Sequence, residues 1–321
     1  MKHTQRPIEI GLNAAIVAVA DRQPLILAVN GDTLPFGPFD PLAHRTFETG
    51  LRAWVAEQTA LKLGYAEQLY TFGDRGRHAA TGDVGPHLVS VGYLALTRID
   101  DEPSEALARA GASWREWYNF FPWEDWREGR PAILDEALLP ALTRWAQTEA
   151  GEKLHTKPFG RRERIRLAFG EGGARWDEER ALDRYELLYE AGIVAEAARD
   201  GREAVSHREN VASGVAMRFD HRRILATAIS RLRAKSKYRP VVFELMADEF
   251  TLTELQRTVE AISGRHVHKQ NFRRLVEGAA LVEPTGATTQ QGRGRPAAMF
   301  RFRREVLKER PAPGFRLGVR A

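Results

Sequence analysis

The sequence predicts an α+β protein of two domains, from its length and from two different patterns of apolar residues. The chain has 321 residues, and a domain usually contains about 100–200, which favours two domains. Residues 1–100 contain short apolar runs typical of strands around one helical pattern, in the order β-β-α-β-β. Residues 239–321 show a helix, a turn, a second helix and two strands.

The N-terminal pattern begins with two apolar runs joined by a polar turn, Asp21-Arg22-Gln23-Pro24, which favours a hairpin. A loop rich in glycine and proline follows. Residues 47–64 then repeat apolar side chains at three- and four-residue steps and end at a glycine, which predicts a helix. Strands are expected at residues 14–19, 25–29, 67–72 and 88–97.

Residues 100–215 are expected to form a mostly helical insert. Four of the seven tryptophans lie between residues 113 and 126, and filling a core or an interface is favoured for them over stacking a base. Helices are predicted at 134–145, 176–199 and, capped by Asp220, 221–235, with a short strand at 214–219.

Composition excludes several classes of protein. There is no cysteine, which excludes disulfides, thiolate catalysis and cysteine-ligated zinc. No apolar run approaches the ~20 residues that a membrane helix needs. The first residues, Met1–Arg6, lead into no signal-type core with a cleavage site, so a cytoplasmic protein is expected.

Positive charge is concentrated at the C-terminal end. The net charge is +5, yet residues 239–321 hold 15 basic and 9 acidic side chains. Such asymmetry is equally consistent with a module that faces a polyanion and with a merely solvated basic surface.

A domain boundary is expected at Tyr238-Arg239-Pro240, which separates residues 1–238 from 239–321. Beyond it, Thr251 and Glu254 form a capping box that opens a helix ending at Gly264. A second helix from about Lys269 to Gly278 and strands near 281–283 and 298–302 complete the pattern of a winged helix-turn-helix domain.

In a helix-turn-helix the second helix reads bases in the major groove of double-stranded DNA. Hydroxyls at the start of the first helix are suited to phosphates, and guanidiniums at the wing tip are suited to a backbone or a minor groove. Use of the domain for protein contacts remains the alternative. The expected DNA-binding residues are Thr251, Thr253, Lys269, Gln270, Asn271, Arg273, Arg274, Arg293 and Arg295.

Several ordered motifs resemble one family. They are Leu51-Arg-x-Trp-Val-x-Glu-Gln-Thr59, Tyr65-x-Glu-Gln-Leu-Tyr-Thr-Phe-Gly-Asp74, Arg184-Tyr-Glu-Leu-Leu-Tyr-Glu-Ala-Gly192, Phe250-Thr-Leu-Thr-Glu-Leu-Gln256, Asn271-Phe-Arg-Arg274 and Gly294-Arg-Pro-Ala297. Together they resemble the Nudix-related transcriptional regulators of NAD metabolism, and the long insert resembles the variant associated with NAD biosynthesis in alphaproteobacteria. The resemblance implies a Nudix-like α/β/α sandwich with a helical insert, followed by the winged helix.

The resemblance also implies a nucleotide effector, ADP-ribose, NAD or ATP, and no required cofactor. Its pocket is expected at Tyr70, Phe72, Asp74, Arg75 and Arg77, where arginines are suited to phosphates; core packing of the two aromatic rings is the alternative.

Hydrolysis is not expected. Active Nudix enzymes carry G-x5-E-x7-R-E-U-x-E-E-x-G-U, in which carboxylates on one helix bind magnesium. When the paired glutamates of the motif are set on Glu57-Gln58, its R-E falls on Ala53-Trp54, and only Glu57 survives. No catalytic residue and no metal ligand is therefore predicted.

The predicted protein is a DNA-binding repressor of NAD biosynthesis genes that senses a nucleotide through a degenerate Nudix-like domain. A homodimer is expected, since two recognition helices must lie about 34 Å apart to read a palindrome. The alternatives are a Nudix-type pyrophosphatase with an accessory winged helix, and a winged helix that serves only oligomerisation.

Overall fold

The computed structural model describes residues 7–74, 85–99, 104–148, 159–201, 213–289 and 296–309. One mixed sheet, with strand order β4-β5-β1-β2-β6 and β3 paired with β1, forms the N-terminal part. Its long strands β1 and β5 are parallel, and the other pairs are antiparallel. The strands are β1 Ile8–Ala20, β2 Gln23–Val29, β3 Phe36–Pro38, β4 Tyr65–Phe72, β5 His87–Leu96 and β6 Ala112–Glu116.

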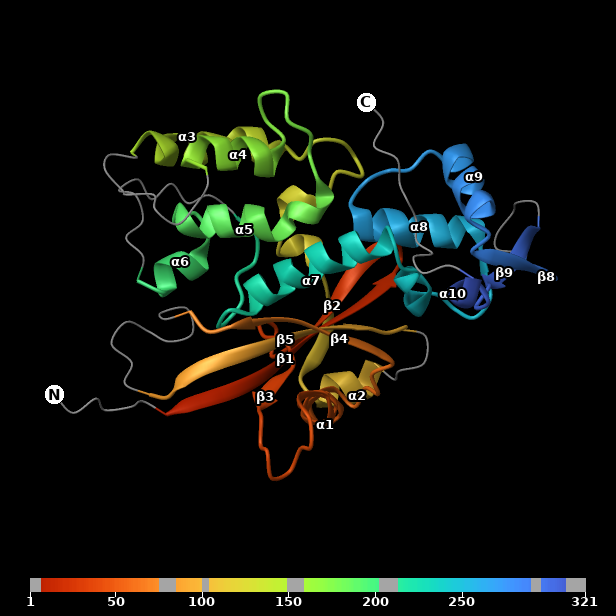
Figure 1. Cartoon of the computed structure of the whole chain (residues 1–321), viewed down its shortest axis with the longest axis horizontal. Coiled ribbons are helices and arrows are strands. Elements are labelled where there is room, and N and C mark those ends of the chain that lie inside the picture. The colour runs from red at the N-terminus through yellow and green to blue at the C-terminus, as the bar shows by residue number, and fades with distance from the viewer. Residues whose placement is uncertain are drawn as a thin grey trace.

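Helices cover both faces of this sheet because β1 is apolar on both sides. Alternate residues of a strand point to opposite faces. Ala14 and Ile16 pack with Leu51 of α1 (Phe47–Thr59), whereas Ala15 and Val17 belong to the core that contains α7 (His221–Ser236). Figure 1 shows α1 and α2 (Ser104–Arg109) on one side of the sheet and α7 with the insert on the other. The expected α/β/α sandwich is confirmed.

The insert begins later than expected, because residues 112–116 form β6. This strand pairs with β2 over Leu25–Val29 and extends the sheet, so the prediction of a mostly helical segment from residue 100 is wrong there. The elements that follow are helical: η1 Trp117–Asn119, η2 Pro122–Glu124, a π-helical turn η3 Leu134–Leu138, α3 Leu139–Gln147, α4 Arg161–Phe169, η4 Glu178–Arg180, α5 Ala181–Glu190 and α6 Ala195–Arg199.

Two expected elements differ in the structure. The helix predicted at 176–199 is broken into η4, α5 and α6, and Gly192 lies between the last two with a φ of 72°, a left-handed conformation that interrupts a helix. The strand predicted at 214–219 is absent from that described segment. Instead, the amides of Val215 and Arg218 donate to the carbonyls of Asn119 and Asp32, which hold the segment as an irregular link.

The tryptophans fill the core, as expected. Trp117 and Trp123 have no exposed surface, and Trp117 packs edge-on against Tyr118 and Trp123 against Phe121. Aromatic rings of this size supply much of the buried apolar area where helices meet a sheet.

The C-terminal part is a winged helix-turn-helix. It comprises η5 Val241–Leu245, β7 Phe250–Thr251, α8 Leu252–Ser263, α9 Lys269–Ala279, β8 Val282–Thr289, β9 Ala297–Phe302 and α10 Val306–Glu309. The capping box forms as predicted, with the Thr251 hydroxyl accepting from the Glu254 amide and the Glu254 carboxylate accepting from the Thr251 amide. β8 is longer than predicted and pairs with β9 as the wing.

Candidate functional site

Helix α9 presents a basic, exposed face next to a buried one. Phe272 and Val276 are fully buried against the rest of the winged helix. The predicted base-reading residues lie on the other side: Lys269, Gln270, Arg273 and Arg274 are exposed, and Asn271 is half-buried. The amphipathic spacing of the helix therefore turns four of the five predicted side chains to solvent.

Helix α8 contributes fewer residues to this face than the sequence predicts. Thr251 is buried, and its hydroxyl bonds with Glu254 in the cap. The Thr251 hydroxyl is therefore not available for a phosphate contact. Thr253 is exposed. Arg257, one turn further along α8, is exposed as well and has no ion pair among the described residues. Its four-residue spacing from Thr253 is the sequence signal that identifies it.

The wing is stabilised by a cross-strand ion pair. Glu283 of β8 and Arg301 of β9 are register partners, and their side chains lie 2.6 Å apart. Arg293 and Arg295, predicted at the wing tip, lie outside the described residues.

Three of the five predicted effector residues, Tyr70, Phe72 and Asp74, lie at or next to the edge strand β4. Tyr70 is 61% exposed, Phe72 is buried, and their rings meet edge to face with centroids 5.3 Å apart. Asp74 forms an ion pair with Arg223 of α7. Arg75 and Arg77 lie outside the described residues.

Tyr70 and Phe72 border a pocket of about 470 Å³ between β4, α5 and α7. A volume of that size is within the range of small-molecule sites. The sequence does not identify the opposite wall, since its residues come from more than a hundred positions further along the chain. That wall is formed by Glu179, Leu182, Glu186, Arg223, Thr227, Ser230, Arg231 and Ala234.

Arg223 is the best-anchored cation of this pocket. Its Nε lies 2.5 Å from Glu186 and its Nη1 3.2 Å from Asp220, and its guanidinium carbon lies 5.1 Å from the centre of the Phe72 ring. Burial would lower the pKa of Arg223, but the neighbouring carboxylates Glu186, Asp220 and Asp74 more than offset this and raise it. Arg223 therefore stays charged at the pocket wall.

Helix α1, on which the sequence analysis set the Nudix motif, is held by structural contacts. The Trp54 ring covers Gly37 so closely that a Cβ there would lie 2.2 Å from it, and its Nε1 donates to the Pro38 carbonyl at 2.8 Å. Gln58 binds both backbone groups of Phe36. Among the described residues, no group of three or more His, Cys, Asp or Glu side chains is arranged to hold a metal ion.

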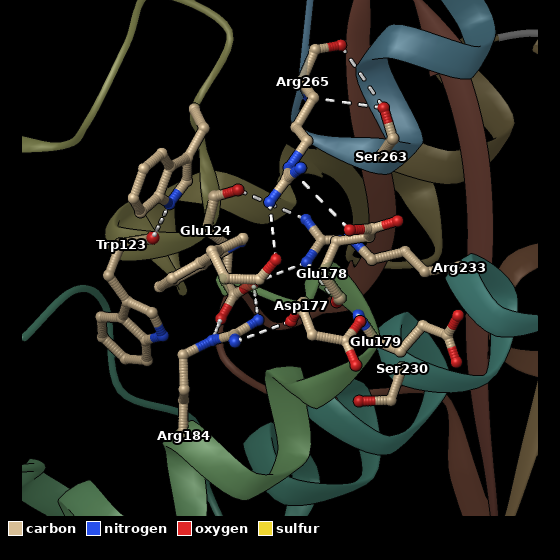
Figure 2. Close-up of polar contacts among 12 residues, drawn as sticks. Trp123, Glu124, Asp177, Glu178, Glu179, Arg184, Ser230, Arg233, Ser263 and Arg265 are labelled. Carbon is tan, nitrogen blue, oxygen red and sulfur yellow. Dashed lines mark hydrogen bonds and ion pairs between the residues drawn. The ribbon is translucent and has the colours of Figure 1, made fainter. Parts of the chain in front are cut away.

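A buried ionic cluster joins the insert to the rest of the molecule (Figure 2). Glu124 of η2 contacts Arg184 of α5 and Arg233 of α7, each at 2.5 Å, and all three residues are buried. Burial alone would raise the pKa of Glu124, but the two guanidiniums outweigh it, so the pKa lies below its ordinary value. No local sequence pattern identifies this cluster, because it pairs residues 60 and 109 positions apart.

Residues 242–302 match the family model described as the NrtR DNA-binding winged helix domain. Over this range the C-terminal domain is similar to the winged helix of NrtR regulators. This match confirms the resemblance for the three motifs that lie within the winged helix.

Similar proteins extend the comparison. The chain is 36% identical over 120 residues to the ADPR responsive transcriptional repressor NtrR of Acinetobacter baylyi, which covers 36% of this chain and 48% of that protein. The chain thus spans about half the length of this curated relative.

Two solved structures of Shewanella oneidensis NrtR resemble the whole fold. One, complexed with a 27mer DNA, matches 93% of this chain and 95% of its own, with a TM-score of 0.52 and 20% identity. The other matches 92% and 95%, with the same TM-score and 19% identity. Together with the NrtR-type winged helix, these matches confirm the predicted fold.

Among the described residues, no helix is long and apolar enough to span a membrane.

We predict that Glu124→Gln destabilises the protein at neutral pH by about 3–5 kcal/mol, since it leaves two buried guanidiniums without their carboxylate. The Glu124 pKa is depressed by folding, so its stabilising effect is present above its ordinary value of 4.5 and is lost as pH falls through the lower folded value. Denaturant titrations from pH 7 to pH 3 should show that the difference in the free energy of unfolding between wild type and variant becomes smaller in the acid range. If that difference did not change with pH, Glu124 would not be charged in the folded protein.

Proposed function

We propose that this protein is a DNA-binding transcriptional repressor of NAD biosynthesis genes, which senses an NAD-related nucleotide through its Nudix-like domain. The observation that carries the proposal is the NrtR-type winged helix, whose helix α9 presents exposed cations. The same chain contains a sandwich domain that borders a pocket. The proposal includes a cytoplasmic location, which is where a bacterial DNA-binding protein acts.

The DNA-binding face consists of the exposed side of α9 and one row of α8. Arginine can pair with guanine, and glutamine or asparagine with adenine. We assign the exposed Thr253 and Arg257 of α8 to phosphate contacts, for which hydroxyls and guanidiniums are suited. Two copies of the chain would bind the two halves of an operator, since one recognition helix reads only one half-site. The residues proposed for this face are Thr253, Arg257, Lys269, Gln270, Asn271, Arg273 and Arg274, with Arg293 and Arg295 of the wing.

The effector site is the pocket between β4, α5 and α7. Tyr70 offers an exposed ring for a base, and Arg223 and Arg231 offer charge for phosphates. ADP-ribose is the first choice of effector because the Acinetobacter relative is named as responsive to it; NAD and ATP are the comparisons. We propose no hydrolysis. Two helix positions that would carry magnesium ligands hold Trp54 and Gln58, whose side chains bind backbone carbonyls of Pro38 and Phe36.

Replacing Arg273 and Arg274 by alanine should weaken binding to a labelled fragment from upstream of NAD biosynthesis genes. Each lost phosphate contact lowers the slope of affinity against salt by about one, and a lost base contact costs about 1–3 kcal/mol. Arg109→Ala, an exposed cation on α2, is the control. Binding that the double variant leaves unchanged would favour a winged helix used only for oligomerisation.

Tyr70→Ala should weaken ADP-ribose binding by about 1–3 kcal/mol if the ring stacks a base, as measured by calorimetry without DNA. Leu42→Ala, which removes a side chain that is 96% exposed on another loop, should bind as wild type does. Equal affinities for all three proteins would place the effector elsewhere.

Purified protein with magnesium should leave ADP-ribose, NAD and NADH intact over hours. Magnesium-dependent turnover that disappears in Glu57→Gln would instead support the pyrophosphatase alternative, because Glu57 is the one acidic residue of the motif that the sequence retains.

A further inference from the structure

The C-terminal end of α8 is capped by groups from outside the winged helix. The last four carbonyls of a helix have no partner within it, and in α8 the final intrahelical bond runs from the Gly264 amide to the Glu260 carbonyl. The hydroxyl of Tyr118 donates to the Ala261 carbonyl at 2.7 Å. Nε of Arg233 donates to the Ile262 carbonyl at 2.9 Å.

The same contact continues into the turn that leads to α9. The Trp126 amide donates to the Gly264 carbonyl at 2.7 Å. A guanidinium nitrogen of Arg265 then donates to the Trp176 carbonyl at 2.9 Å. The insert thus holds both the last residue before the turn and the first residue within it, and that turn sets the direction of α9.

Gly264 permits this close approach. Its φ is 70°, and a Cβ there would lie 2.4 Å from the Glu124 carbonyl oxygen and 2.9 Å from the Tyr118 hydroxyl. Backbone meets backbone at this position, so α8 and the insert cannot slide past each other without breaking the cap.

Helix α7 connects this cap with the pocket. Thr227, Ser230, Arg231 and Ala234 of α7 line the pocket, and Arg233 of the same helix holds the Ile262 carbonyl and Glu124. A ligand that contacts the pocket wall therefore contacts the helix that caps α8. The insert supplies the remaining contacts on both sides: Leu182 and Glu186 at the pocket, and Tyr118 and Trp126 at the cap.

We propose that Tyr118 and Arg233 are positioning residues that hold the helix-turn-helix in a defined orientation on the effector domain, and that this cap transmits effector binding to α9. The inference rests on the proposed function. A ligand shifts the equilibrium between two orientations of the helix-turn-helix only by the difference in its affinity for them. A rigid cap would pass a small movement of α7 on to α8.

The test compares Tyr118→Phe with Tyr189→Phe. The first removes the bond to the Ala261 carbonyl and the 3.5 Å contact from Arg233. The second removes the hydroxyl of another buried tyrosine, whose partly buried bond to Asp200 at 2.8 Å stays inside the insert. Affinity for the labelled promoter fragment is measured by fluorescence anisotropy with and without saturating ADP-ribose, and ADP-ribose binding without DNA is measured by calorimetry.

The coupling is the ratio of the DNA dissociation constant with ADP-ribose to that without it. In Tyr118→Phe this ratio should move toward one by about two- to tenfold, the range expected for one hydrogen bond. The ratio should keep its wild-type value in Tyr189→Phe. Arg233→Lys, which keeps a cation near Glu124 but loses the Nε bond to Ile262, should reduce the ratio in the same direction and provides a second variant if Tyr118→Phe does not fold.

An unchanged ratio in both Tyr118→Phe and Arg233→Lys would overturn the inference and leave the cap a purely stabilising contact. Wild-type protein that binds neither the fragment nor ADP-ribose would overturn the proposed function, and the inference with it. Wild-type protein that binds both, with a ratio of one, would leave DNA binding standing and overturn the coupling alone.

Discussion

The burial of a single carboxylate, that of Glu124, is the constraint on which the arrangement of three parts of the chain depends. An unpaired charge at such a site costs several kcal/mol, so a carboxylate enters a core only together with its partners. Its partners are Arg184 of α5 and Arg233 of α7. Forming the cluster therefore brings the insert, α7 and, through the Arg233 bond to Ile262, helix α8 into one packed unit.

Helix α7 has three roles at once. Ile224 packs close to Gly92 of the sheet, Arg223 borders the pocket, and Arg233 contacts the winged helix. A helix of 16 residues moves largely as one body. A displacement of its pocket-lining residues would therefore also displace Arg233. The insert serves the same connection from outside: it closes the pocket with α5 and caps α8 with Tyr118.

In the sandwich domain, side chains of the first helix are engaged in structural contacts. A hydrolase of this architecture needs carboxylates on its first helix to hold magnesium. Here the corresponding helix carries Trp54, whose ring rests on Gly37, and Gln58, which binds the backbone of Phe36. These contacts stabilise the β3–α1 junction, and a fold by itself does not specify an activity.

The sequence by itself determined those elements whose signals are local. The capping box of Thr251 and Glu254, the glycine that ends α8 and the apolar spacing of α9 each lie within a few turns, and each formed as predicted. Tyr70 and Phe72 were expected at a pocket from the family resemblance, and in the structure both border one. Only the tertiary structure decided what faces them: Arg223 lies about 150 positions further along the chain, and Glu124 meets Arg233 over 109. No periodicity encodes such pairs, because they result from how helices pack on a sheet rather than from the propensity of any segment.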